Sequence, residues 1–169
     1  MKKLMPGTDS YYIDTKGFDT YKQMIEIGNG LSLSQVCSIT KLEPHMIQNW
    51  VKRGYIPHPN KKRYFTKHLA RILLINALRE CMYIEDVGML MVYINGDVDD
   101  ESDDMISEED LYKLFSSIVY ELDDLNKIEQ VVDRNVKNQK LNKCMKVMVY
   151  AYVGSLMSKK SDEFLQKLK

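Results

Sequence analysis

Apolar residues recur three and four positions apart along most of the chain, which is the spacing of amphipathic helices. The pattern predicts helices over residues 18–27, 33–40, 44–53, 67–81, 83–93, 107–136 and 141–156. Residues 1–17 have no clear period and are expected to form an irregular arm. The chain is therefore predicted to be mainly α, and its last two helices are predicted to form a helical hairpin.

Two of the short helices lie close together and have clear start and stop signals. Ser32 and Gln35 have the spacing of a capping box, so a helix is expected to begin at Leu33. A four-residue turn follows, and Pro44 suits the first position of the next helix because its missing N–H costs nothing there. Gly54 suits a left-handed cap at the end of that helix. This order is the signature of a helix-turn-helix.

The second helix of the pair has two distinct faces. Its apolar face needs a core and consists of Ile47, Trp50 and Val51. The other face carries imidazole, amide and ammonium groups, from His45, Gln48, Asn49 and Lys52. Such groups suit base edges and phosphates, so the helix is predicted to read DNA.

A basic segment follows this helix. Residues 55–59 contain two prolines and are expected to be extended. Asn60, Lys61 and Lys62 would form a tight tip, and residues 63–65 would return as a second short strand. The prediction is a small β-hairpin wing, with Lys61, Lys62 and Arg63 on phosphates.

Charge is segregated, although the formal net charge is zero. Residues 31–80 hold nine Lys/Arg against two acids, and residues 97–133 hold fourteen acids against two lysines. Such segregation favours a polyanion-binding module joined to a part with another role. Arg71 and Arg79 could instead pair with acids of the second half.

Several other classes of protein are disfavoured. No run of roughly 18 apolar residues is present, so no membrane span is expected. The start of the chain lacks the apolar stretch of a signal peptide, and Cys37, Cys81 and Cys144 form no CxxC pair, which favours a reducing cytoplasm. The acidic run 97–104 has Ser102 where a calcium loop needs glycine, and His58 and His68 lack partners at metal spacing. No catalytic motif appears, so we expect neither an enzyme nor a cofactor or metal.

Residues 31–95 resemble the MerR-type winged helix-turn-helix. The resemblance rests on the helix ending at Thr40, the apolar pair Ile47 and Trp50, the segment Gly54–Pro57, and the later YIED. The stretch MIQNWVKRGYIPHPNKKRYFTKHLARILLINALRE is similar to an uncharacterised bacterial family, a domain of unknown function with a MerR-like fold. Lys41 replaces the usual turn glycine, and Gln48 replaces the common recognition-helix arginine.

The resemblance implies a cytoplasmic, sequence-specific transcriptional regulator that binds double-stranded DNA as a homodimer. It implies a DNA-binding domain at 31–95. The sequence pattern places an arm and short helix at 1–30 and an acidic loop with a helical region at 96–169, and whether that region dimerises is left open. The expected DNA contacts are His45, Gln48, Asn49, Lys52, Arg53, Lys61, Lys62, Arg63 and Tyr64.

An alternative keeps the winged helix as a scaffold in a protein-interaction adaptor that does not bind DNA. Its acidic half would bind a basic partner or mask the basic half. A protein partner or a small-molecule effector at the C-terminal helices remains open. The operator sequence and the direction of regulation do not follow from the sequence.

Overall fold

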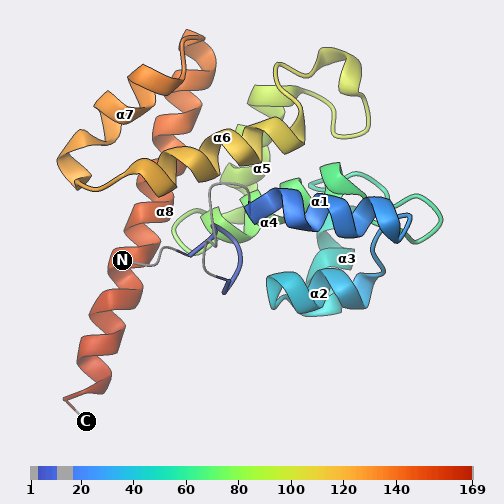
Figure 1. The fold of residues 1–169 in the computed structure, drawn as a ribbon, viewed down its shortest axis with the longest axis horizontal. Coiled ribbons are helices and arrows are strands. Elements are labelled where there is room, and N and C mark those ends of the chain that lie inside the picture. Colours follow the sequence, from blue (N-terminus) through green and yellow to red (C-terminus); the bar gives the residue numbers. More distant parts are fainter. Residues whose placement is uncertain (1–3, 11–16, 169) are drawn as a thin grey trace.

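The computed structural model describes residues 4–10 and 17–168. Helices follow one another along these residues, joined by short connections (Figure 1). The α-helices are α1 (Gly17–Ile27), α2 (Leu33–Thr40), α3 (Pro44–Lys52), α4 (Thr66–Leu78), α5 (Ile84–Asn95), α6 (Glu108–Glu121), α7 (Ile128–Asn135) and α8 (Gln139–Gln166). Two short 3-10 turns are η1 (Glu101–Asp103) and η2 (Leu125–Lys127). The prediction of a mainly α protein is confirmed.

Helix α4 lies at the centre of the core. Its sequence from Leu69 to Leu78 is apolar on nearly every face, and almost all of these residues are buried. A helix that is apolar all round must be covered on all sides, and α4 contacts α1, α2, α5, α6 and α8. One continuous apolar core therefore joins the N-terminal and C-terminal helices. The boundary expected between residues 95 and 96 stays a prediction.

The predicted β-hairpin wing is wrong. The described residues between α3 and α4 contain no strand, only an isolated antiparallel bridge between Asn60 and Arg63 and another between Leu31 and Tyr64. Pro57 and Pro59 have no N–H to donate, so the segment cannot supply a regular ladder. The winged part of the predicted fold class is accordingly replaced by an irregular loop with a tight turn.

The single long helix predicted over residues 107–136 is also wrong. Helix α6 ends at Glu121, and Leu122 is extended, with φ −68° and ψ 112°. The side chain of Asp124 then accepts a hydrogen bond from the backbone N–H of Asn126, so Asp124 is the N-cap residue of η2. Aspartate often competes for backbone N–H groups in this way, so the chain turns before α7. The C-terminal part is three helices rather than a hairpin.

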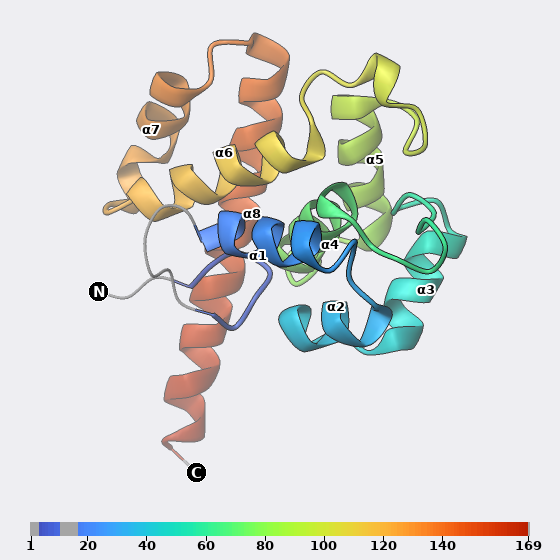
Figure 2. The ribbon, with the colours of Figure 1, turned by 45° about the vertical axis from the view of Figure 1, so that its right-hand side comes forward.

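Helix α8 is longer than predicted and extends beyond the rest of the molecule at its C-terminal end (Figures 1 and 2). Its first half packs on α4, α6 and α7, and residues 157–168 are exposed.

Within residues 4–10 and 17–168, none of the helices has the length and apolar character that crossing a bilayer requires.

Candidate nucleic-acid interface

The α2–α3 pair has the local geometry that its sequence predicts. The backbone N–H of Gln35 donates to Ser32 Oγ (3.3 Å), and the N–H of Ser32 donates to Gln35 Oε1 (2.8 Å), which completes a capping box. Lys41 caps α2 in the left-handed conformation at φ 58°, which favours glycine over residues with a Cβ atom. Leu42 is buried in the turn, so the angle between the two helices is fixed by packing.

Helix α3 is held on the core by its apolar face and by its C-terminal cap. Ile47 and Trp50 are buried, as predicted. Gly54, at φ 74°, donates its N–H to Val51 O, and Tyr55 N donates to Trp50 O. This pair of hydrogen bonds is a Schellman motif, which satisfies the last carbonyls of the helix.

The opposite face of α3 is open to solvent. All four of its polar side chains are exposed: His45, Gln48, Asn49 and Lys52. Within the part of the chain that the structure describes, none of them takes part in a side-chain hydrogen bond or an ion pair. We call these four residues the contact face. Because these side chains make no hydrogen bonds within the described residues, their polar groups are available to a partner.

The basic tip is a two-residue turn in an uncommon conformation. Asn60 and Arg63 exchange backbone hydrogen bonds of 3.1 and 2.8 Å. Lys61 and Lys62, between them, have φ values of 48° and 62°. Positive φ at both central positions is typical of a type I′ turn, which normally uses asparagine and glycine. We call Asn60–Arg63 the basic turn; its side chains are exposed, and Figure 2 shows its loop on the same side as α3, away from α8.

Two of the predicted contact residues are engaged elsewhere. Arg53 Nη2 donates to Glu85 Oε1 of α5 (2.7 Å), and its guanidinium lies 4.8 Å from the centroid of the Tyr55 ring. The hydrogen bond from Arg53 lowers the pKa of the Glu85 carboxyl. Tyr64 is buried, and burial raises the pKa of its hydroxyl. Arg53 thus ties α3 to α5, and Tyr64 is part of the core.

Two buried side chains of α4 hold the loop that carries the basic turn, a role that the hydrophobic pattern of α4 does not predict. His68 Nδ1 accepts the N–H of Phe65 (2.9 Å), and Nε2 lies 3.1 Å from His58 O. Because burial lowers its pKa, His68 is neutral, with its proton on Nε2. Arg71 Nε donates to Tyr55 O (2.7 Å). These partners are 3 to 16 positions away in sequence, and only the closest has a recognisable local spacing, that of an N-cap residue and N3.

The acidic loop at residues 97–104 lies beside the same segment. Asp99 Oδ2 is 3.4 Å from His58 Nδ1, and Glu101 pairs with Lys67 at the start of α4. These pairs are exposed and contribute little to stability. The pair of Glu101 with Lys67 neutralises part of the positive charge around the loop, and the lysines of the basic turn are unpaired within the described residues.

In residues 4–10 and 17–168, no three His, Cys, Asp or Glu side chains are arranged to hold a metal ion.

Comparisons with other proteins give a family but no activity. Residues 18–115 match the family described as a domain of unknown function (DUF1836). The chain is 30% identical over 105 residues to a protein of Bacillus subtilis (strain 168) described as "Uncharacterized protein YkrK". That alignment covers 60% of this chain and 41% of the relative, so the chain spans about two fifths of the curated relative's length. No solved structure matches the chain.

Proposed function

The chain belongs to the family described as a domain of unknown function (DUF1836), and we propose that it is a sequence-specific DNA-binding transcriptional regulator. The observation that carries the proposal is the contact face of α3, which is exposed and unpaired within the described residues on a rigidly capped helix. The resemblance of the α2–α3 pair to that of MerR-type regulators supports the same function.

In this proposal, α3 enters the major groove. Gln48 and Asn49 carry side-chain amides, and an amide pairs with the N6 and N7 edge of adenine through two hydrogen bonds. His45, in the first turn of α3, and Lys52, in its last, lie at the two ends of the contact face and reach the phosphates on either side. Base contacts supply specificity here, and phosphate contacts fix the register.

The basic turn supplies affinity that does not depend on base sequence. Lys61 and Lys62 project from a two-residue turn, and Arg63 follows them in the exposed part of the loop. Residues other than glycine at positive φ are strained, and such strain is often kept at functional sites. We infer that the strained turn is retained because it holds two ammonium groups at phosphate-contacting positions.

A homodimer would place two contact faces on successive half-sites. Helix α8 suits this role because its first half is apolar on two sides. The inner side of that half is buried in the core, and the outer side of the helix carries exposed apolar residues. We define the outer seam as five exposed apolar residues, four on α8 and the last just beyond its end: Val147, Tyr150, Met157, Phe164 and Leu168. With Gly154 and Ser161 included, successive positions of the seam are alternately three and four residues apart. This is coiled-coil spacing, and we propose a second copy of the chain as its partner.

The adaptor alternative is favoured by one observation. The acidic loop pairs with Lys67 and with His58, so part of the basic side is already neutralised by the chain itself. A protein that only presents a scaffold to a partner would have the same pairs. A measurement of DNA binding distinguishes the regulator from the adaptor.

The test is binding of the full chain to fluorescent mixed genomic DNA at several salt concentrations, followed by selection of bound sequences from random DNA. Asn49→Ala should relax the preference at one base position by about 1–3 kcal/mol. Lys61→Ala/Lys62→Ala should weaken binding to all sequences alike. The matched control is Lys140→Ala/Lys143→Ala, which removes the same charge from exposed positions of α8. Absence of salt-dependent binding by the wild type, or equal losses in the control, would overturn the proposal in favour of the adaptor.

A further inference from the structure

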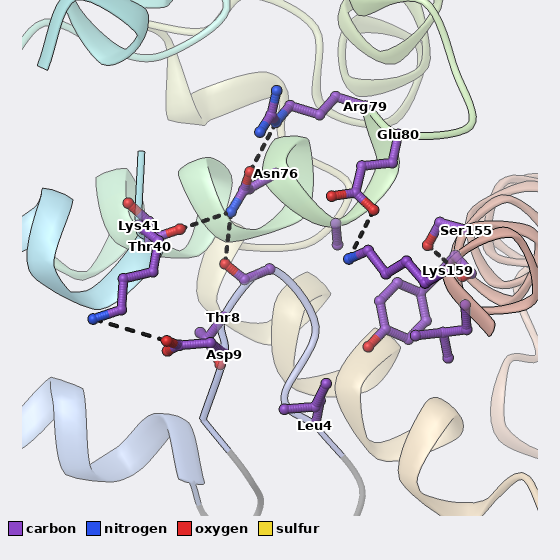
Figure 3. A pocket seen from close by; sticks show the side chains of 14 residues that line it. Leu4, Thr8, Asp9, Thr40, Lys41, Asn76, Arg79, Glu80, Ser155 and Lys159 are labelled. Atoms are coloured by element: carbon purple, nitrogen blue, oxygen red, sulfur yellow. Dashed lines mark hydrogen bonds and ion pairs between the residues drawn. The ribbon is translucent and has the colours of Figure 1, made fainter. Parts of the chain in front are cut away.

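A polar cavity lies on the side of the α2–α3 turn that faces α8. Its volume is about 200 Å³, and it is lined by residues 4 and 7–9, the ends of α2 and α4, and one face of α8 (Figure 3). Cavities that bind drug-sized ligands measure roughly 300–1,000 Å³, so this one suits a smaller molecule. It does not include the contact face or the basic turn.

Two ion pairs stand on opposite sides of the cavity (Figure 3). On one side, Lys41 Nζ of the α2–α3 turn lies 3.8 Å from Asp9 Oδ2. On the other, Lys159 Nζ of α8 lies 2.8 Å from Glu80 Oε2. Both pairs are largely exposed, so their charges are available to a ligand at low energetic cost.

Arg79 also lines the cavity, and its exposed side chain is held by the half-buried Asn76. Its Nε donates to Asn76 Oδ1 (2.8 Å). Asn76 Nδ2 in turn donates to Gly7 O (2.8 Å) and to Thr40 O (3.1 Å). The two terminal nitrogens of the Arg79 guanidinium have no hydrogen-bond or ion-pair partner within the described residues. The lining therefore carries a surplus positive charge on an oriented guanidinium.

A lysine or arginine near the end of one helix is common, because a cation complements the helix dipole. Here the cations come from three elements that are distant in sequence and converge on one cavity: Lys41, Arg79 and Lys159. A dipole effect at one helix end does not account for that convergence.

We propose that this cavity binds a small metabolite bearing an oxyanion, either a carboxylate or a phosphate ester, with Arg79 as its bidentate partner. A guanidinium matches the geometry of both oxyanions through two parallel N–H···O bonds. The oxyanion of the ligand would take the place of Asp9 beside Lys41, or of Glu80 beside Lys159.

This site has a regulatory consequence that rests on the proposed function. Lys41 lies in the turn, three residues before the first residue of α3. Lys159 belongs to the helix that carries the outer seam. A ligand that contacts both would link the position of the DNA-reading pair to the dimerising helix. The ligand and DNA would then alter each other's affinity by the same factor.

The test is thermal denaturation of the full chain without DNA, titrated with sodium citrate or with glycerol 3-phosphate at ionic strength held constant with NaCl. A saturable rise in Tm is expected for one of the two probes, because a ligand that binds only the folded state stabilises it. A rise with citrate alone identifies a carboxylate ligand, and a rise with glycerol 3-phosphate alone identifies a phosphate ester.

Arg79→Gln should weaken the effective probe at least tenfold, and Lys159→Gln should weaken it by a smaller factor. Arg134→Gln is the matched control, because it removes an exposed arginine that pairs with Glu121 away from the cavity. No saturable rise with either probe, or an unchanged titration in Arg79→Gln, would overturn the proposal.

The result is independent of DNA binding. A protein that binds a probe but no DNA keeps the cavity site and loses the regulator function. A protein that binds DNA but neither probe keeps the regulator function and loses the cavity site. If both bind, the DNA dissociation constant is measured with and without the probe, and an unchanged constant removes the regulatory consequence alone.

Discussion

Arg71 of α4 pairs through its guanidinium with the carboxylate of Glu108 in α6, and both side chains are buried. The same arginine donates from Nε to Tyr55 O (2.7 Å), just beyond the end of α3. Asn95 at the end of α5 donates to the same Glu108 oxygen (3.3 Å). One polar cluster thus fixes the chain after α3 against α4, α5 and α6. The α2–α3 pair is therefore joined to the C-terminal helices through this cluster.

Removing one partner of the Arg71–Glu108 pair should lower the free energy of unfolding much more than replacing both partners with apolar residues. Arg71→Met leaves a buried, uncompensated carboxylate and should reduce the free energy of unfolding by about 3–5 kcal/mol. The double variant Arg71→Met/Glu108→Leu should recover most of that loss, since the second oxygen of Glu108 already lacks a hydrogen-bond partner in the described residues. Urea denaturation measures both. The exposed pair of Arg134 with Glu121 is the control, and Arg134→Gln should cost less than about 1 kcal/mol. A cost for Arg71→Met no greater than the control's would contradict the burial argument.

The basic turn should show a trade between stability and DNA affinity. Lys61→Asn/Lys62→Gly gives the turn the residues that its conformation favours, and should raise the free energy of unfolding by about 1 kcal/mol. It also removes two ammonium groups, so the slope of log K against log salt for DNA should fall in magnitude by about 2. The control Lys61→Arg/Lys62→Arg keeps both charges and should keep the slope. If the Asn/Gly variant bound DNA with the wild-type slope, the turn would not be a phosphate contact.

His68 should make stability depend on pH. Burial lowers the pKa of its folded state, so below about pH 6.5 the unfolded chain binds a proton that the folded chain resists. Stability from this residue is therefore present above that pH and declines as the pH falls toward the folded pKa. His68→Gln can keep both hydrogen bonds without titrating, and should flatten the decline between pH 7 and 5 in urea denaturation. Equal pH profiles for wild type and His68→Gln would refute this assignment.

The outer seam of α8 should control self-association. Phe164→Glu/Leu168→Glu should raise the dimer dissociation constant at least about a hundredfold, because each buried Phe or Leu contributes ~1.5–3 kcal/mol. Sedimentation equilibrium measures the change. Gln166→Glu adds a charge on the other side of the helix and should leave the constant unchanged. A monomeric wild type would remove the dimer from the proposed function.

Local chemistry in the sequence determined the α2–α3 pair. The capping box at Ser32 and the glycine at the end of α3 act through hydrogen bonds that span at most five residues. The proline at the start of α3 acts through its fixed φ and its missing N–H. The burial of Ile47 and Trp50 follows from their spacing on one helix face. Features of this kind depend on neighbours along the chain, so sequence reasoning predicted them correctly. DNA binding by this pair stays a prediction.

The tertiary structure decided everything that depends on partners distant in the chain. Extended residues after α3 became a loop rather than strands because their hydrogen-bonding groups found side chains such as His68 and Asp99. Arg53 found Glu85, 32 positions away, and Arg71 found Glu108, 37 positions away. The basic turn depends on both kinds of information. Its residue types predicted a tight, cationic tip, but only the folded chain shows that Lys61 and Lys62 have positive φ. The physical reason is that a local pattern specifies which groups seek partners, whereas packing around α4 specifies which partners come within reach.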